Sequence, residues 1–481
     1  EKATNQSMIS YTQKGRQNMK KVVVVGVVAV LLLGLLPMGV FAQSATSQTW
    51  STSITYYTPS ATGGTLQIRY YAEGSSSPIN ATPITLQPHK AGSLYIGSSD
   101  AGPVPDPFKG AAVLEADVPI IATAVNIAGG GDYPRPLYTG FDPSKASQDF
   151  NIPTVLKKYG STSLISIQNT ETSQISATLK VFAVGSTTPT VQQTYTIPGQ
   201  SAKLVSSDDL GLSDFTGSAV VEATGKVVAA VQETADSGLP AAAFEGLPAD
   251  AGATTIYMAS MLCQKWGSTS YYAIQNAGTS QASVAIDYYN TAGVKLLTTP
   301  TFNIAVGNKA STDPCTDGVA ADNYGSAVIR STNSVPLIAM GKISGTNLTT
   351  TAYLGESAGA QKVGAAYIRW KADKTQGERA NVAVMNVGTA AATDIKVMYY
   401  NNQGNLAATE TLASGGSPVG QFIKKNSNWE TASGGNTDFG VNPYGGAIEV
   451  TSNQPVVVVV RISKEVGGKT LVEDYNGVPL P

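Results

Sequence analysis

The stretch CQKWGSTSYYAIQNAGTSQASVAIDYYN, residues Cys263–Asn290, decides the fold because the chain contains a second copy of it. Residues Tyr159–Phe182 read YGSTSLISIQNTETSQISATLKVF and align with Trp266–Tyr289 without a gap. The offset of 107 residues is the length of a domain, whereas solenoid units recur every ~20–50 residues. The sequence therefore predicts tandem domains of one kind.

Six landmarks recur four times along the chain in a constant order. They are an opening aromatic, a turn at Asn (Thr58 in the first copy), a strand ending in paired aromatics, a Gly-small-Ala-aliphatic strand, its hairpin partner, and a closing aromatic-x-Gly. These landmarks define units 1 to 4, which are residues 46–146, 147–252, 253–360 and 361–481. Each unit is close to the commonest size of an independently folding domain.

The residues of unit 3 read as short strands separated by turn signals. In Ser283–Tyr289, Val284, Ile286 and Tyr288 alternate with the residues between them, so we expect one face of this strand to be buried and the other to be solvated. Short strands with turn signals every 8–12 residues or so are typical of a β-sandwich. We therefore predict an all-β protein of four tandem Ig-like antiparallel β-sandwich domains arranged as a rod.

The segment Met19–Ala42 has the composition of a secretory signal peptide. A basic MKK is followed by an apolar run, and Val40-Phe41-Ala42 fits a cleavage site. We expect a signal-peptide helix at 19–42, its cleavage, and a secreted or cell-surface protein without a stable membrane span; an uncleaved membrane anchor is the alternative. Residues 1–18 are polar and unlike the rest of the chain, and we interpret them as a mis-assigned upstream segment, with translation starting at Met19 or Met8.

The charge balance of the chain excludes one class of partner. There are 31 Lys and Arg residues against 33 Asp and Glu, and only 13% of the residues are charged. Nucleic acids and anionic membrane surfaces attract clusters of Lys and Arg, which the mature part of the chain lacks. We therefore expect no nucleic-acid partner.

Two cysteines, Cys263 and Cys315, both lie in unit 3. A pair within one domain of an exported protein indicates a disulfide, and two free buried thiols are the alternative. Closing a loop of this length would stabilise the domain by roughly 4 kcal/mol in the chain-entropy model.

Residues capable of catalysis are scarce. The one histidine, His89, lies in the turn Gln87–Lys90 and reads as a solvated turn residue, which leaves little for a catalytic triad or a His-rich metal site. A glycoside hydrolase that uses two carboxylates is harder to exclude. No unit departs from its copies at a single site, however, so we predict no enzyme and no catalytic residue.

Acidic residues gather in the loop before each Gly-small-Ala strand. Solvated turns are the simpler interpretation, and calcium, which prefers carboxylate and carbonyl oxygens, is the alternative; no other cofactor is expected. These residues are Asp100, Asp106, Asp208, Asp209, Asp214, Asp313, Asp317, Asp322, Glu430 and Asp438.

The closing aromatic of one unit lies shortly before the opening aromatic of the next. We expect each pair to meet at the joint between consecutive domains and to limit its bending, because amphipathic rings suit half-exposed contacts. The alternative is a carbohydrate platform, in which exposed rings stack on sugars. The residues of this predicted interdomain joint are Tyr138, Tyr159, Phe244, Trp266, Tyr353 and Trp370.

The repeated pattern of KKYGSTSLISIQNTETS, a Tyr-Tyr strand, GSAVV and Tyr-Asn-Gly resembles a tandem Ig-like β-sandwich repeat of large secreted and cell-surface bacterial proteins. The resemblance implies structural or adhesive spacers without catalytic residues. We therefore expect a non-enzymatic secreted or cell-surface protein that binds itself, neighbouring surface proteins, or cell-wall or extracellular polysaccharide, and that can assemble into a coat, sheath or fibre. A carbohydrate-binding module array is the alternative.

Overall fold

The computed structural model describes residues 6–12, 21–28, 50–128, 135–235, 241–369, 378–412, 421–426 and 445–481, and only the backbone of 6–12, 21–28 and 421–426. Within these residues the regular structure consists of β-strands and three short 3-10 helices. The all-β prediction is therefore confirmed. The 3-10 helices are η1 (Ser99–Ala101), η2 (Pro143–Lys145) and η3 (Ala249–Ala251).

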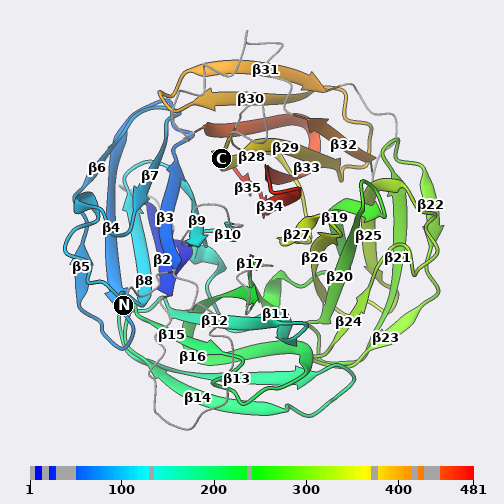
Figure 1. Cartoon of the computed structure of the whole chain (residues 1–481), viewed down its shortest axis with the longest axis horizontal. Coiled ribbons are helices and arrows are strands. Elements are labelled where there is room, and N and C mark those ends of the chain that lie inside the picture. Colours follow the sequence, from blue (N-terminus) through cyan, green and yellow to red (C-terminus); the bar gives the residue numbers. More distant parts are fainter. Residues whose placement is uncertain are drawn as a thin grey trace.

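The four units close into a ring instead of extending as a rod. Seen along the shortest axis of the molecule, they occupy the four quarters of a disc in chain order (Figure 1). Unit 1 contacts unit 4 directly, since the Tyr57 hydroxyl donates a 2.8 Å hydrogen bond to Glu449 Oε1. The prediction of a rod is wrong because a chain of sandwiches can also bury apolar surface between its first and last members.

Unit 3 is built from two packed antiparallel sheets. An outer sheet has the order β19-β25-β21-β22, with β23 also paired to β21, and an inner sheet has the order β24-β20-β26-β27. The strand runs expected in this unit are present, but the expected run 294–304 is divided into β22 and β23, and β19 is a strand that the pattern did not mark. The strands are β19 (Thr255–Cys263), β20 (Ser268–Asn276), β21 (Ala282–Asn290), β22 (Lys295–Thr298), β23 (Phe302–Ile304), β24 (Lys309–Thr312), β25 (Asn323–Ser331), β26 (Leu337–Gly345) and β27 (Leu348–Leu354).

Units 2 and 4 repeat this arrangement with one change. A single long strand, β16 or β33, replaces the hairpin of β25 and β26 and runs from the outer sheet into the inner one. The strands of unit 2 are β11 (Ser147–Lys158), β12 (Ser161–Asn169), β13 (Ile175–Ala183), β14 (Val191–Ile197), β15 (Ala202–Ser206), β16 (Phe215–Ala235), β17 (Ala241–Glu245) and β18 (Leu247–Pro248). Those of unit 4 are β28 (Ala360–Ile368), β29 (Arg379–Asn386), β30 (Ile395–Asn401), β31 (Leu406–Leu412), β32 (Gln421–Asn426), β33 (Gly446–Val466), β34 (Lys469–Asn476) and β35 (Val478–Pro479).

Unit 1 has the same two sheets, but a segment from outside the unit completes its outer sheet. In units 2 to 4 the place beside the Gly-small-Ala strand belongs to the unit's own first strand, β11, β19 or β28. In unit 1 this place is taken by β2 (Lys21–Val28), which pairs with β8 and with β1 (Gln6–Thr12). The other strands are β3 (Trp50–Tyr57), β4 (Gly64–Ala72), β5 (Pro78–Asn80), β6 (Ile84–Leu86), β7 (Ala91–Tyr95), β8 (Gly110–Ala116), β9 (Ile121–Ala128) and β10 (Leu137–Thr139).

Two finer expectations about fold differ from the structure. Lys21–Val28 is a strand, whereas a signal-peptide helix was expected there; residues 29–42 of that segment lie outside the described ones. The strand order also differs from that of an immunoglobulin constant domain, in which the first two strands pair within one sheet. In unit 3 the first strand, β19, belongs to the outer sheet and the second, β20, to the inner sheet.

Steric crowding explains why the Gly-small-Ala strand begins with glycine. A Cβ at Gly217 would lie 2.0 Å from the carbonyl oxygen of Phe182, and one at Gly325 would lie 2.1 Å from that of Tyr289. These strands therefore approach the ends of the paired-aromatic strands more closely than any side chain permits. The two landmarks occur together in the sequence because they touch in the fold.

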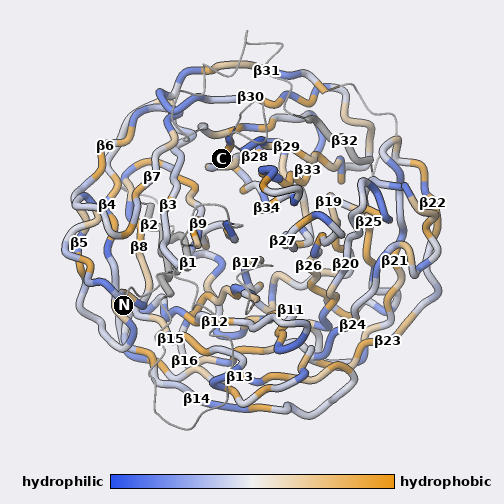
Figure 2. Tube along the Cα trace, in the orientation of Figure 1, coloured by the Kyte–Doolittle hydropathy of each residue, from blue (hydrophilic) through white to orange (hydrophobic). Residues whose placement is uncertain are grey.

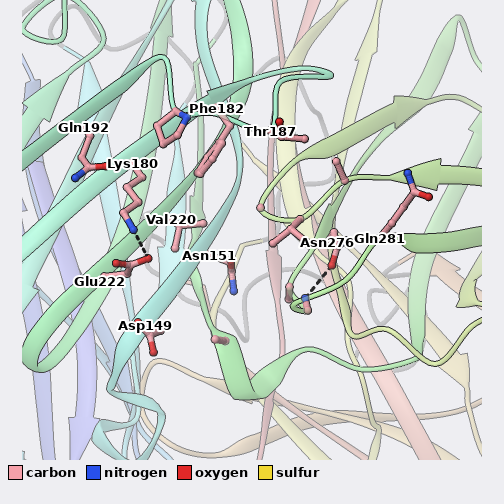
Figure 3. A pocket seen from close by; sticks show the side chains of 17 residues that line it. Asp149, Asn151, Lys180, Phe182, Thr187, Gln192, Val220, Glu222, Asn276 and Gln281 are labelled. Atoms are coloured by element: carbon pink, nitrogen blue, oxygen red, sulfur yellow. Dashed lines mark hydrogen bonds and ion pairs between the residues drawn. The ribbon is translucent and has the colours of Figure 1, made fainter.

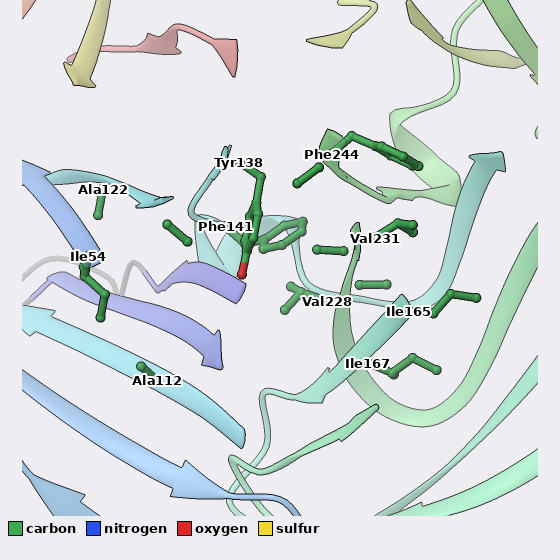
Figure 4. Close-up of a cluster of buried hydrophobic side chains, with 14 of the residues drawn as sticks. Ile54, Ala112, Ala122, Tyr138, Phe141, Ile165, Ile167, Val228, Val231 and Phe244 are labelled. Carbon is green, nitrogen blue, oxygen red and sulfur yellow. The ribbon is translucent and has the colours of Figure 1, made fainter. Parts of the chain in front are cut away.

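Burial extends across the units. Hydrophobic and hydrophilic residues alternate along many strands (Figure 2), yet both faces of β21 are buried, because Asp287 on the face expected to be solvated is fully buried and paired with Arg330. One apolar cluster joins units 1 and 2 and contains Tyr138, Phe141 and Phe244 (Figure 4). Such shared cores resist bending between units more than separate ones would.

Candidate functional site

The predicted disulfide is present. Cys263 at the end of β19 is bonded to Cys315, with their Cα atoms 5.2 Å apart. It ties the first strand of unit 3 to the acidic loop that precedes β25. The bond is therefore a structural link and not part of a reactive site.

Five of the six aromatics of the predicted joint lie among the described residues, and their burial does not fit contact between closing and opening rings. The closing residues Tyr138, Phe244 and Tyr353 are almost fully buried, on or next to the innermost strands. Of the opening residues, Tyr159 is 81% exposed and Trp266 is 61% exposed. The opening residue of unit 4, Trp370, lies outside the described residues. The closing residues lie on β10, β17 and β27 near the centre of the disc (Figure 1), whereas Tyr159 and Trp266 lie in exposed turns.

Trp266 instead lies between units 3 and 4. Its ring is 4.9 Å from that of Tyr324, and Lys265 Nζ lies 5.2 Å from its centre. Both aromatics line a small cleft with Asn381 of β29. Trp266 is therefore an exposed ring beside a later joint, not the contact with Phe244 that was predicted.

The actual joint uses a turn that the landmark pattern does not include. In units 1, 2 and 3 this turn has a residue with positive φ at the same place, namely His89, Gln200 and Gly307. Each turn contacts the end of the paired-aromatic strand of the preceding unit around the ring. At two of these joints the turn lies against the second residue of the paired-aromatic landmark, with His89 on Tyr400 and Gly307 beside Phe182, which the pattern marked only as a strand end.

Three contacts illustrate this joint. The Ser201 hydroxyl of unit 2 donates a 2.8 Å hydrogen bond to the Ala72 carbonyl of unit 1. Asn308 Nδ2 of unit 3 donates to the Ala183 carbonyl of unit 2 at 2.9 Å. At the closure between units 1 and 4, the His89 ring stacks on Tyr400, with ring centres 4.8 Å apart. The one histidine therefore helps to close the ring, whereas a solvated turn residue was expected.

The Asn of the Gln-Asn motif is structural. Asn276 Nδ2 donates to the carbonyls of Ser280 and Ile304, and its Oδ1 accepts from the Gly278 N–H. The preceding Gln275 reaches into unit 2, where its Nε2 donates a 3.0 Å bond to the Ala219 carbonyl. The motif thus fixes a turn and a joint together.

The acidic loops are held by internal hydrogen bonds. Asp313 Oδ1 accepts from the N–H groups of Cys315 and Thr316, and Asp317 accepts from Tyr288 and Thr312. Among the described residues, no three His, Cys, Asp or Glu side chains gather closely enough to hold a metal ion. The loop of unit 4 that carries Glu430 and Asp438 lies outside them.

A pocket of about 550 Å³ opens at the centre of the ring, and all four units line it. We call it the axial pocket. It is bordered by the strands nearest the axis, β10, β17, β27 and β34, which contact one another around the ring (Figure 1). Its walls are mainly apolar, with Ile121, Phe141, Leu354 and Leu480 among the residues that form them.

Each unit contributes the middle residue of its aromatic-x-Gly motif to the wall of this pocket. This residue differs in every unit, being Thr139, Glu245, Leu354 and Asn476 in chain order. The Thr139 N–H donates to Glu245 Oε1, and the Leu354 N–H donates to Asn476 Oδ1 at 2.8 Å. The four equivalent residues meet near the centre of the ring, but their side chains are of four different types. A binding site within repeated units needs such a difference between the copies. Only the fold reveals that these four positions converge.

Three carboxyl groups line the axial pocket, those of Asp142, Glu245 and Glu356, and the two glutamates accept hydrogen bonds from residues of other units. Asn476 Nδ2 donates a 2.7 Å hydrogen bond to Glu356 Oε1, and Glu245 accepts from Thr139. Burial raises the pKa of both Glu245 and Glu356 to about 7, in spite of these hydrogen bonds. Within the described residues, neither carboxylate has an ion-pair partner.

A second, open groove of about 790 Å³ lies between units 2 and 3 (Figure 3). Asp149, Lys180, Gln192 and Glu222 line its unit 2 side around the ring of Phe182. Gln281 and the Asn276 turn line its unit 3 side (Figure 3). Lys180 and Glu222 form an ion pair of 2.6 Å. We call this surface the inter-unit groove.

Comparison with known proteins does not assign the chain to a family. No protein-family model matches the chain, and no curated protein matches it in sequence. One similar solved structure is titled "Biofilm associated protein - BSP domain", with a TM-score of 0.17 and 7% identity over 99% of this chain and 96% of that one. Such a TM-score carries no argument about fold or function. Within the described residues, no helix has the length and apolarity that crossing a membrane requires.

Proposed function

We propose that the protein is a non-enzymatic secreted or cell-surface structural and adhesive protein that holds extracellular polysaccharide in the inter-unit groove. The lining of the groove is the observation that supports this proposal. Amide, carboxylate and hydroxyl groups line an open surface whose floor includes the largely buried Phe182 ring. Amides and carboxylates that hydrogen-bond sugar hydroxyls are the chemistry that polysaccharide binding needs.

The carboxylates favour binding over hydrolysis. Glu222 in the groove is paired with Lys180. In the axial pocket, burial raises the pKa of both Glu245 and Glu356, and the charge of Glu245 adds to the rise at Glu356. A glycoside hydrolase needs one carboxyl held protonated beside another held ionised, and neither of these two groups has a lowered pKa.

Affinity electrophoresis through gels that contain extracellular or cell-wall polysaccharide tests the adhesive function. Gln192 and Gln281 are exposed, so changing both to Ala should leave the fold intact and weaken retardation at least several-fold. Gln193→Ala, at the exposed neighbouring position of β14, should have no effect. Retardation that is equal for both variants would reject the groove, and release of reducing ends would reject a non-enzymatic role.

Self-assembly into a coat, sheath or fibre is the structural part of the proposal. The partly exposed edge strands of the four outer sheets, β5, β14, β22 and β31, offer repeated weak contacts around the ring that multivalency can sum. Electron microscopy of the purified secreted protein at increasing concentration should show ordered arrays of discs. Isolated discs at all concentrations would restrict the function to adhesion by single molecules.

A further inference from the structure

The axial pocket carries an inference separate from the inter-unit groove. It exists only because the ring closes, since units 1 to 4 each contribute to its wall. Its volume of about 550 Å³ falls within the ~300–1,000 Å³ typical of small-molecule sites, which are apolar with a few placed polar groups. The pocket therefore has the size and lining of a ligand site.

The charge in the pocket is not balanced from within the chain. Glu245 at the end of β17 and Glu356 after β27 are negative when ionised, and the other charged side chains that line the pocket are Asp142 and Lys145 at η2. Lys145 is exposed and forms no ion pair with either glutamate, and its more distant charge offsets that of Glu356 only in part. Ionising both glutamates thus leaves net negative charge against apolar walls, which is unfavourable without a cation.

We propose that the axial pocket binds an organic ammonium ion with an apolar body, such as an alkylammonium. The alkyl part would lie against Ile121, Phe141 and Leu480, and the ammonium group would take the counter-ion place beside Glu245 and Glu356. A neutral ligand of the same shape would fill the walls and leave the carboxylates without a partner. A carboxylate ligand would add a like charge.

The pH dependence of binding is set by the two glutamates of the free pocket. Because the pKa values of Glu245 and Glu356 are raised to about 7, both groups are largely protonated at pH 6 and largely ionised at pH 8. An ammonium ion binds the ionised form, so its affinity rises with pH through this window and protons are released on binding. We expect a change of about tenfold or more between pH 6 and pH 8.

Isothermal titration of the full chain with hexylammonium, 1-hexanol and hexanoate tests the proposal. Hexylammonium should bind most tightly at pH 8 and at least about tenfold more weakly at pH 6. Glu245→Gln and Glu356→Gln should each reduce its affinity about tenfold, since each removes one charge-assisted contact. Glu222→Gln in the inter-unit groove is the matched control and should leave binding unchanged.

Binding of 1-hexanol and hexanoate to the unmodified chain tests the proposal even if the Glu245→Gln or Glu356→Gln variant is unstable. If 1-hexanol or hexanoate binds the unmodified chain as tightly as hexylammonium at pH 8, the pocket is not an ammonium site. Affinity for hexylammonium that is independent of pH would also overturn the proposal. Neither result bears on polysaccharide binding at the inter-unit groove.

Discussion

Lys309 is a buried cation at the boundary between units 2 and 3. Its side chain is 5% exposed, and its Nζ donates a 2.9 Å hydrogen bond to the Thr154 hydroxyl of unit 2. Burial, with the nearby Lys342 as a smaller contribution, lowers its pKa to about 7. The equivalent residue of unit 2 is Ala202, so the joint does not require a charge at this place.

We expect Lys309→Met to stabilise the protein near neutral pH. The lowered pKa means that the folded state binds fewer protons than the unfolded state between pH 7 and about 10.5, so the wild-type free energy of unfolding rises with pH across that window. Met removes the cost of the buried charge, so the variant should be roughly 2–4 kcal/mol more stable than the wild type at pH 6, and this gain should shrink toward pH 9.5 because the Met side chain does not titrate. Urea unfolding at pH 6 and pH 9.5 measures this, with the exposed Lys226→Met as control. If the Met variant is less stable than the wild type, the hydrogen bond from Lys309 to Thr154 stabilises the fold by more than burial of the ammonium group costs.

The strands are the part of the fold that the sequence predicts best. Alternation and turn residues located most strands of unit 3, and the occurrence of both cysteines in one unit of an exported chain indicated the disulfide. The ring was not predictable in this way, because its joints are made by turn residues such as Gln200 and Gly307 and by the buried Gln275, none of which follows a hydrophobic period. The axial residues Glu245 and Asn476 were hidden because a residue between two recurring landmarks reads as a spacer until the four copies are placed around one axis.

Strand β8 gives a prediction about processing. Its outer neighbour β2 lies within the segment predicted to be a signal peptide, so cleavage after Ala42 would remove β2 from the sheet. An open edge of the apolar sequence GAAVLEA is a template for pairing with another chain. We expect a chain that begins at Gln43 to exchange the amide hydrogens of β8 at least about tenfold faster than a chain that begins at Met19, and to dimerise with concentration.

Hydrogen exchange and light scattering of the two chains measure this. Strand β25 serves as the internal control, because its neighbour β19 is present in both chains. Equal protection of β8 in two monomeric chains would show that β2 does not shield this edge. Protection of β8 that grows with protein concentration would identify the edge as the contact between copies.

At the scale of the molecule, the contact between units 1 and 4 separates a ring from a rod. Glu449 is 2% exposed and accepts from the Tyr57 hydroxyl, while Lys362 Nζ lies 3.4 Å from its other oxygen. Arg135 of unit 1 and Glu378 of unit 4 form a second bridge of 2.8 Å. Removing the Tyr57 hydroxyl and the Arg135 guanidinium takes one partner each from Glu449 and Glu378, which keep Lys362 and Arg369. Losing such buried contacts costs more than losing an exposed pair.

The double variant Tyr57→Phe, Arg135→Met should therefore open the ring without unfolding the units. The closed ring is a compact body of over 400 residues, for which the radius of gyration is about 22 Å, and an open array should be markedly larger. Small-angle scattering measures the change, and circular dichroism checks that the strands persist. Tyr95→Phe, at a 46% exposed ring, is the control and should keep the compact radius of gyration.

Because the axial pocket exists only when units 1 and 4 meet, the opened variant should also lose hexylammonium binding. Binding that survives opening would place the ligand elsewhere than on the ring axis.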